Sequence, residues 1–345
     1  MKIQFKKDKI PSYIAFFLIM IAFVMVLSFI IKAITVYKNG GEIENDRTAN
    51  VNVMLTRPEN WEKIQTGKIS ITKEDLMTID GSTATIPITA ELARQFCNAS
   101  DDNISEFIDH NTTHNAYYNL IHTKKGRMDE NYSRKYLIFA TEPSVEEIKM
   151  ANDNGFNLDV TPVALDGFVF ITHKDNPIDS LTVEQIQKIY SGEITNWKEV
   201  GGNDAEIIPY QRESNSGSQT AMEQLVMKDV SLMEPIGYSI SYGMGELIEK
   251  VAEYQNRENS IGYTYYYYIN NLYRNENIKV LKVDGISPDN ENLIDKSYPF
   301  TTAYYAVLIE GHKGHMTELR DYLLTDEGQK IIEMAGYCPV NSLEK

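Results

Sequence analysis

The stretch Asp166–Gly202 reads DGFVFITHKDNPIDSLTVEQIQKIYSGEITNWKEVGG and contains the pattern that decides the fold. It overlaps an apolar run, Thr161–Thr172, whose length and composition are typical of a buried strand. The segment Thr182–Tyr190 then has the apolar spacing of a helix, and Glu206–Tyr210 is strand-like again. Short strands that alternate with helices predict an α/β body.

The remaining organisation agrees with that class. Met316–Ala335 has apolar residues at helical spacing, interrupted by the turn Thr325–Gly328, so we expect two successive helices. A chain of 345 residues with 42% hydrophobic residues can bury a sizeable core, and its length suggests about two compact units.

The charge balance limits the partners. Acidic side chains outnumber basic ones 49 to 33, a net charge of −16, so neither nucleic acid nor an anionic membrane surface is expected as a partner. An anionic ligand would have to be held locally, by helix N-termini and a well-placed arginine.

The chain has two cysteines, Cys97 and Cys338, without the spacing of a zinc ribbon or a redox motif. They could form one bridge in an oxidising compartment, or remain two buried thiols. We expect no cofactor and no metal.

The N-terminal region predicts a membrane anchor. Ile14–Ile31 is apolar except for Ser28, and four lysines precede it, which orients a single span with residues 1–12 in the cytoplasm and the bulk outside. We assign 13–36 to the span and 37–67 to an extracellular spacer. A cleaved signal peptide is the alternative, but no small-x-small cleavage site follows the apolar run.

Three segments could hold an anion, and Asp80–Pro87 is the first. Gly81 would let the backbone approach closely, while Ser82 and Thr83 offer hydroxyls and amide hydrogens where a helix begins, after a strand-like region at Lys68–Ile71. An ordinary helix cap is the alternative, and these residues alone favour it.

The second segment, Gln211–Thr220, reads QRESNSGSQT and leads into an expected helix at Ala221–Met227. Ser216, Gly217 and Ser218 place hydroxyls and amides at the helix start. Arg212 precedes them by four residues, where its guanidinium could donate to two oxygens of one anion. The alternative is a solvated arginine beside a capping serine.

The third segment, Leu137–Ser144, is strand-like up to Thr141, Glu142 and Pro143. Glu142 could accept a hydrogen bond from the P–OH group of a protonated phosphate, whereas it would repel sulfate. A surface acid near a helix N-terminus is the alternative.

These segments, in this order, resemble the phosphate-binding protein family of phosphate ABC importers, which has the type II periplasmic-binding-protein fold. The most specific matches are the SLT, IYSGEITNW and VGG parts of Asp166–Gly202, with YLLTDEGQKIIEMAGYCPV near the C-terminus. The resemblance implies a binding domain at 68–345 with an interlobe cleft: lobe 1 at about 68–165 and 262–345, and lobe 2 at about 166–261.

Carried over residue by residue, the resemblance implies a phosphate site formed by the following residues: Ser82, Thr83, Glu142, Arg212, Ser216, Gly217 and Ser218. Ser218 stands where threonine is usual and Glu142 where aspartate is common. The family's Gly-Ser-rich loop would fall on His110–Asn115, HNTTHN, which has no glycine and where Thr112 or Thr113 could supply the hydroxyl.

Two further patterns allow other interpretations. His110 and His114 have the spacing of a helical zinc pair, but no third ligand is evident and the stretch is expected to be a loop. The tyrosines between 263 and 268 could suit an aromatic or carbohydrate ligand, but strand and hinge packing explains them better.

We therefore expect a monomeric extracellular protein, not an enzyme, that binds inorganic phosphate and delivers it to the permease of an ABC importer. The alternatives are a phosphate-ester hydrolase with a Ser82 or Ser216 nucleophile, which lacks a G-x-S-x-G motif, and an anchored oxyanion sensor or adhesin with the same fold.

Overall fold

The computed structural model describes residues 61–64, 66–67, 69–124, 134–235, 239–253 and 258–340. The expected cytoplasmic segment, the membrane span and most of the spacer lie outside these ranges. Within these ranges, no helix combines the length and the apolar character that crossing a membrane requires.

A mixed sheet forms the centre of the body, with the strand order β1-β2-β11-β3-β8-β5, and β9 and β12 also pair with β3. Its strands are β1 (Ile79–Gly81), β2 (Leu137–Ala140), β3 (Leu158–His173), β5 (Ile208–Pro209), β8 (Ser260–Tyr265), β9 (Ile278–Val280), β11 (Thr301–Ile309) and β12 (Cys338–Pro339). Two short parallel pairs lie apart from it: β4 (Ser180–Leu181) with β10 (Lys282–Val283), and β6 (Gln211–Arg212) with β7 (Ile240–Ser241).

Strand β3 connects the two ends of this sheet. Its first part pairs with β11 from Leu158 to Gly167, and its second part pairs with β8 from Phe168 onward. Residues 163–173 of β3 are all buried, which explains their nearly continuous apolar sequence. The expected strand at 161–172 is thereby confirmed.

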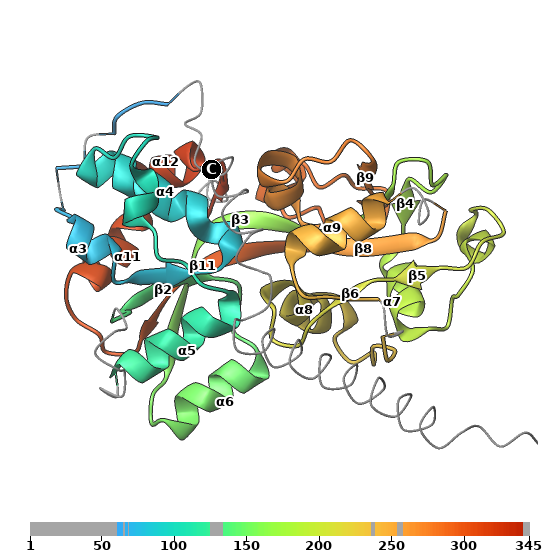
Figure 1. Cartoon of the computed structure of the whole chain (residues 1–345), viewed down its shortest axis with the longest axis horizontal. Coiled ribbons are helices and arrows are strands. Elements are labelled where there is room, and N and C mark those ends of the chain that lie inside the picture. Colours follow the sequence, from blue (N-terminus) through green and yellow to red (C-terminus); the bar gives the residue numbers. More distant parts are fainter. Residues whose placement is uncertain are drawn as a thin grey trace, which may run out of the picture. The chain divides into compact units, whose positions relative to one another are not determined.

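Helices pack around both ends of the sheet (Figure 1). The helices and turns are α3 (Lys73–Leu76), η1 (Thr83–Thr85), α4 (Ile86–Cys97), η2 (Ile104–Phe107), α5 (Thr113–Lys124), α6 (Val145–Asp153), α7 (Val183–Ser191), η3 (Trp197–Val200), α8 (Gly217–Ala221), η4 (Met222–Met227), α9 (Met244–Ala252), η6 (Tyr268–Leu272), α10 (Asn290–Ile294), α11 (His315–Leu323) and α12 (Asp326–Met334). Helix α12 packs on α4 and α5 on α6, whereas α9 lies against β8.

Helix starts follow from local capping. Thr182 accepts from the Gln185 amide while the Gln185 side chain accepts from the Thr182 amide, so the SLT sequence begins α7. Gly192 ends this helix with φ 85°, a conformation that glycine adopts without strain. The helix expected at 182–190 and the two helices near the C-terminus are confirmed.

Four expectations need correction. Residues 69–71 form no strand; Thr72 caps α3 there, and β1 lies further along. The strand expected at Glu206–Tyr210 shrinks to β5, because Ile207 instead bonds to Thr195 O. The helix expected at Ala221–Met227 begins earlier as α8 and continues as the wider π-helical turn η4. The stretch expected as a loop at His110–Asn115 contains the first turn of α5.

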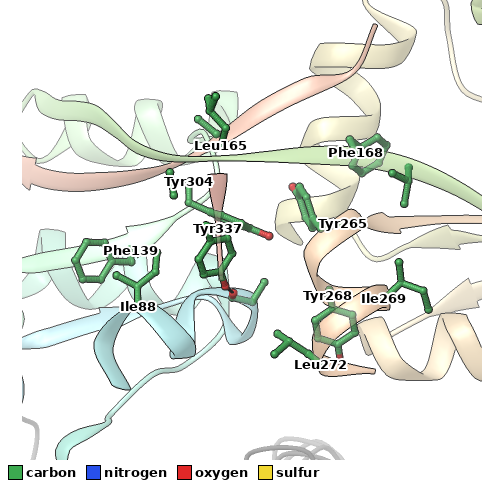
Figure 2. Close-up of a cluster of buried hydrophobic side chains, with 14 of the residues drawn as sticks. Ile88, Phe139, Leu165, Phe168, Tyr265, Tyr268, Ile269, Leu272, Tyr304 and Tyr337 are labelled. Atoms are coloured by element: carbon green, nitrogen blue, oxygen red, sulfur yellow. Dashed lines mark hydrogen bonds between the residues drawn. The ribbon is translucent and has the colours of Figure 1, made fainter. Parts of the chain in front are cut away.

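Aromatic packing fills the region around β3. Figure 2 shows Phe168, Tyr265, Tyr304 and Tyr337 close to this strand, with Phe139 and Ile88 further along the core. Tyr263, Tyr265 and Tyr268 are buried, which agrees with strand and hinge packing rather than with an exposed aromatic surface.

Both cysteines are free thiols, Cys338 buried and Cys97 half-buried. Of the two alternatives for the pair, the structure has the unbridged one.

Candidate functional site

The first part of the candidate site lies where β1 and β2 end. These strands are parallel, with Gly81 opposite Phe139, so the residues that follow both strands meet at one edge of the sheet. The Ser82 amide donates to Phe139 O at 2.9 Å, and the Thr85 hydroxyl donates to the same oxygen at 2.7 Å. Ser82 is 6% exposed and its hydroxyl caps no helix amide, so the simple cap interpretation does not hold there.

The start of α5 is tied to this edge by two side chains. His110 Nδ1 contacts Ser82 O at 3.1 Å, and its Nε2 contacts Thr89 Oγ1 at 2.8 Å. Burial lowers the pKa of His110, and a neutral ring satisfies both contacts if Nδ1 carries the hydrogen. Asn111 donates twice to the buried Asp80 carboxylate, at 2.7 and 2.9 Å. These bonds fix the residues that directly precede Thr112 and Thr113 to the end of β1.

Both ring nitrogens of His110 are therefore engaged by protein atoms, Ser82 O and Thr89 Oγ1, which gives this histidine a structural role. No group of three metal-ligating side chains occurs in the part of the chain that the structure describes, and His114 contacts Glu147 Oε1 at 3.2 Å instead.

Arg212 is buried and is held by several acceptors at the end of β6. Its Nε donates to Ser241 O at 3.0 Å, one terminal nitrogen donates to Ser218 Oγ at 3.3 Å, and the other contacts Tyr242 O and Glu213. Arg212 is therefore fixed beside the start of α8, as the sequence predicts. Burial raises the pKa of Glu213, whereas the nearby Arg212 charge lowers it.

The first residues of α8 have different surroundings. Ser216 Oγ accepts from the Gln219 amide at 3.3 Å, so its hydroxyl acts as a helix cap. Gly217 and Ser218 are buried, and Gly217 O accepts from the Tyr265 hydroxyl at 3.0 Å.

Gly217 brings the parts of the site together. A Cβ atom at this position would lie 2.5 Å from Thr141 Oγ1 and 2.8 Å from Thr113 Oγ1. The start of α8 therefore faces the hydroxyls at the end of β2 and at the start of α5. Nearby, Asn215 Nδ2 donates to Glu146 Oε2 at 2.5 Å and Gln224 Nε2 to Pro143 O at 3.4 Å, which joins the same two regions.

Thr141 is a residue that the sequence interpretation passed over in favour of its neighbour Glu142. Its hydroxyl is buried and makes no hydrogen bond of normal geometry among the described residues. Such a group calls for a partner, because an unpaired buried hydroxyl is costly. Glu142 itself is exposed, and Thr83 and Thr112 are half-buried. The sequence feature that could have identified Thr141 as a site residue is its position directly after the apolar strand.

The two ends of the mixed sheet share the long strand β3, and the starts of α5 and α8 face each other with polar residues. This arrangement is that of a solute-binding protein of the periplasmic type. The family model for the PBP superfamily domain matches residues 137–327, and the chain belongs to this superfamily.

Individual relatives agree with this assignment. A crystal structure assigned as a phosphate ABC transporter substrate-binding protein with bound phosphate, from Clostridium perfringens, is 30% identical, with a TM-score of 0.58 over 76% of this chain and 98% of that one. The phosphate-binding protein PstS of Borreliella burgdorferi is 27% identical over 277 residues, 78% of this chain and 91% of its own. An ABC-type phosphate transport receptor from Vibrio cholerae, 22% identical with a TM-score of 0.53, shares the fold over 75% of this chain. The resemblance seen in the sequence is confirmed.

Proposed function

We propose that the chain binds inorganic phosphate between two lobes and delivers it to the permease of an ABC importer. The lobes would be those implied by the sequence, 68–165 with 262–345, and 166–261. The observation that carries this proposal is Gly217, because the helix start there faces Thr113 and Thr141 while Arg212 is fixed beside it. The relatives from Clostridium perfringens and Borreliella burgdorferi, whose names state phosphate, supply the ligand class.

A phosphate ion that enters the site loses its water, so the protein must supply hydrogen-bond donors in place of that water. Amide hydrogens at the start of α8, hydroxyls of Thr113, Thr141 and Ser218, and the Arg212 guanidinium would replace water around its oxygens. Ser82, Thr83 and Thr112 would complete the set from the other helix starts. Binding of this kind requires no chemical step on the ligand, which fits a family of binding proteins rather than enzymes.

Titration calorimetry of the full chain with phosphate, arsenate, sulfate and molybdate tests the ligand. Arg212→Ala should weaken phosphate binding by about 2–5 kcal/mol, because it removes the charge that pairs with the buried anion. The matched control is Arg274→Ala, since Arg274 is exposed and its Nε donates to Asn270 O within the same turn. Unchanged phosphate affinity in Arg212→Ala would remove this residue from the site.

The exposed acid Glu142 supplies a second test, on selectivity. Its charge acts on the neighbouring tyrosines Tyr117 and Tyr305, in addition to the burial that raises their pKa, so it lies at the end of β2 close to the site. We expect Glu142→Gln to narrow the preference for phosphate over sulfate, because a neutral amide no longer repels an anion that has no proton to donate. Competition titrations measure the ratio, with the exposed Glu193 changed to glutamine as the control. An identical ratio in Glu142→Gln and the parent chain would contradict this role.

The location outside the cell and the anchor at 13–36 belong to the same proposal and depend on the apolar run at the N-terminus. Expressed in a bacterium, the full chain should resist extraction from membranes by alkaline carbonate, whereas a chain without residues 1–36 should be released. Extraction of both forms would refute the anchor without affecting the phosphate proposal.

A further inference from the structure

A polar cavity lies at the middle of β3, and the residues proposed for phosphate do not line it. It has a volume of about 170 Å³ and is lined from four segments of the chain: the centre of β3, the residues after β8, the start of α10 and the turn before β12. None of Thr113, Thr141, Arg212 or Gly217 lines it. The space is large enough for several water molecules.

A buried carboxylate lines this β3 cavity, and only one of its two oxygens accepts hydrogen bonds of normal geometry. Asp166 is 2% exposed, and its Oδ1 accepts from the Gly167 amide at 2.7 Å and from the Tyr267 amide at 3.0 Å. Its Oδ2 makes no hydrogen bond of normal geometry among the described residues. The Tyr304 hydroxyl lies close enough to lower the pKa of Asp166, but it too is without a bond of normal geometry. Figure 2 shows Tyr304 and Tyr337 near this part of β3.

The remaining lining is neutral and rich in oxygen. Asn270, Asn271 and Asn290 line it with Tyr266, Tyr267 and Tyr337, whereas no lysine, arginine or histidine does. The hydroxyls of Tyr267 and Tyr337 donate to Ala335 O and Ala84 O, so their oxygens can serve only as acceptors toward a ligand. Asn270 donates its NH₂ group to Tyr266 O, which leaves its carbonyl oxygen as an acceptor. The site therefore carries a single formal charge, a negative one, within a chain whose net charge is −16.

These features select the class of ligand. A buried carboxylate oxygen that has no hydrogen bond of normal geometry is stabilised by a cation, because burying a poorly paired charge is costly. One carboxylate with neutral oxygens suits a singly charged ion, since divalent calcium sites usually collect several carboxylates. The volume exceeds that of a bare ion, so the ion would keep part of its water.

We propose that the β3 cavity binds one monovalent cation, an alkali-metal or ammonium ion, with Asp166 Oδ2 as its charged ligand and the asparagine and tyrosine oxygens as neutral ones. The cavity lies where β3 changes its partners from β11 and β12 to β8, so a bound ion would join all of these segments.

Proton and cation would compete for the same oxygen. Burial raises the pKa of Asp166 to about 7. Burial also raises the pKa of every other titratable group of the cluster, that of Cys338 to about 11 and those of Tyr265, Tyr266, Tyr267, Tyr304 and Tyr337 above their ordinary value. The charges that act on these groups from neighbouring elements are Arg94 of α4, Arg212 of β6, Asp289 before α10 and Glu333 of α12. Asp166 is therefore the lining group whose charge changes near neutral pH.

The test is thermal unfolding of the full chain at about pH 8.5, where Asp166 is ionised, with N-methylglucamine chloride replaced at constant concentration by sodium, potassium, ammonium or methylammonium chloride. At least one of these ions should raise the unfolding midpoint by about 2–4 °C over N-methylglucamine, a much larger organic cation. The ion that gives the largest shift identifies the ligand as a metal or an ammonium species. No shift with any of them overturns the proposal.

Asp166→Asn keeps the shape of the side chain but removes its charge, and it should abolish the ion-specific shift. Glu333→Gln is the matched control, because it removes an exposed acid of the same neighbourhood that does not line the cavity. A shift in Asp166→Asn as large as in the parent chain refutes the site. If that variant does not fold, the parent chain still decides the question: the shift should disappear at about pH 5.5, where Asp166 is protonated, and a pH-independent shift counts against the site.

Discussion

At position 217 a single methyl group would meet two hydroxyls at once, Thr141 Oγ1 at 2.5 Å and Thr113 Oγ1 at 2.8 Å. Gly217→Ala should therefore raise the dissociation constant for phosphate at least about tenfold, because the added Cβ pushes the start of α8 away from both threonines. The backbone of Gly217 is not left-handed, so alanine is compatible with this helix position. Calorimetric titration measures the loss.

The matched control for this change is Gly243→Ala. Gly243 likewise lies at a helix start, as the residue before α9, but a Cβ atom there would meet only Glu246, at 3.7 Å or beyond. We expect wild-type phosphate affinity in the control and similar unfolding midpoints without phosphate in both variants. Equal affinity in the two variants would show that Gly217 does not approach the ligand.

Residues of the site that lie in one local motif could be predicted, whereas those that depend on distant partners could not. Arg212 and Ser218 are six positions apart, so their contact was foreseeable from the sequence. The Arg212 amide, in contrast, donates to the Tyr263 hydroxyl 51 residues away. His110 seemed a metal candidate because its spacing to His114 is local, while its actual partner Ser82 is 28 residues distant.

Among the elements, α6 shows how a local cap positions the end of β2. The Ser144 hydroxyl accepts from the Glu147 amide at 3.2 Å, and the Glu147 side chain accepts from the Ser144 amide at 2.8 Å. Ser144→Ala should reduce the free energy of unfolding by about 1 kcal/mol and lower the midpoint by about 2–4 °C, because one buried helix amide loses its acceptor. Thermal unfolding followed by circular dichroism measures this.

Ser144→Thr provides the rescue, since threonine also accepts from the third amide of a helix. It should recover most of the lost stability. Equal losses in the two variants would show that packing at position 144, rather than the cap, sets the stability of this helix start.

Elements bounded by capping residues were predicted best. The helix expected at Thr182–Tyr190 begins one residue later as α7, where Thr182 and Gln185 form the cap that fixes its start. Strands were predicted less well where pairing sets their length: β5 keeps only Ile208 and Pro209, because only these two residues pair with β8. Strand length depends on a partner elsewhere in the chain, which apolar alternation in one segment does not reveal.

For the whole molecule, alternation of strands and helices gave the α/β class, but the topology came from resemblance to a family. Nothing local to β3 shows that its first part pairs with β11 and its second part with β8, since residues 163–173 are buried on both sides of this change of partner. The order in which distant segments join one sheet is a property of the complete chain. The periodicity of one strand therefore cannot supply it.

Contacts between the two proposed lobes should contribute to the lifetime of the bound state. Asn215 of the segment before α8 donates to Glu146 of α6 at 2.5 Å, and both residues lie at the surface. If phosphate holds the lobes together, Asn215→Ala should raise the dissociation constant about three- to tenfold, the range for one hydrogen bond of about 0.5–1.5 kcal/mol. The loss should appear in the dissociation rate, because the contact forms after the ligand has entered.

Stopped-flow measurement of phosphate association and release separates the two rates. Asn203→Ala is the control, since Asn203 is an exposed asparagine of the same proposed lobe whose backbone oxygen accepts locally from the Ala205 amide. Faster release with unchanged association in Asn215→Ala, and neither change in the control, is the expected pattern. Slower association with unchanged release would contradict this. It would mean that the Asn215 contact forms before the anion binds, so that the two proposed lobes already touch here when phosphate arrives.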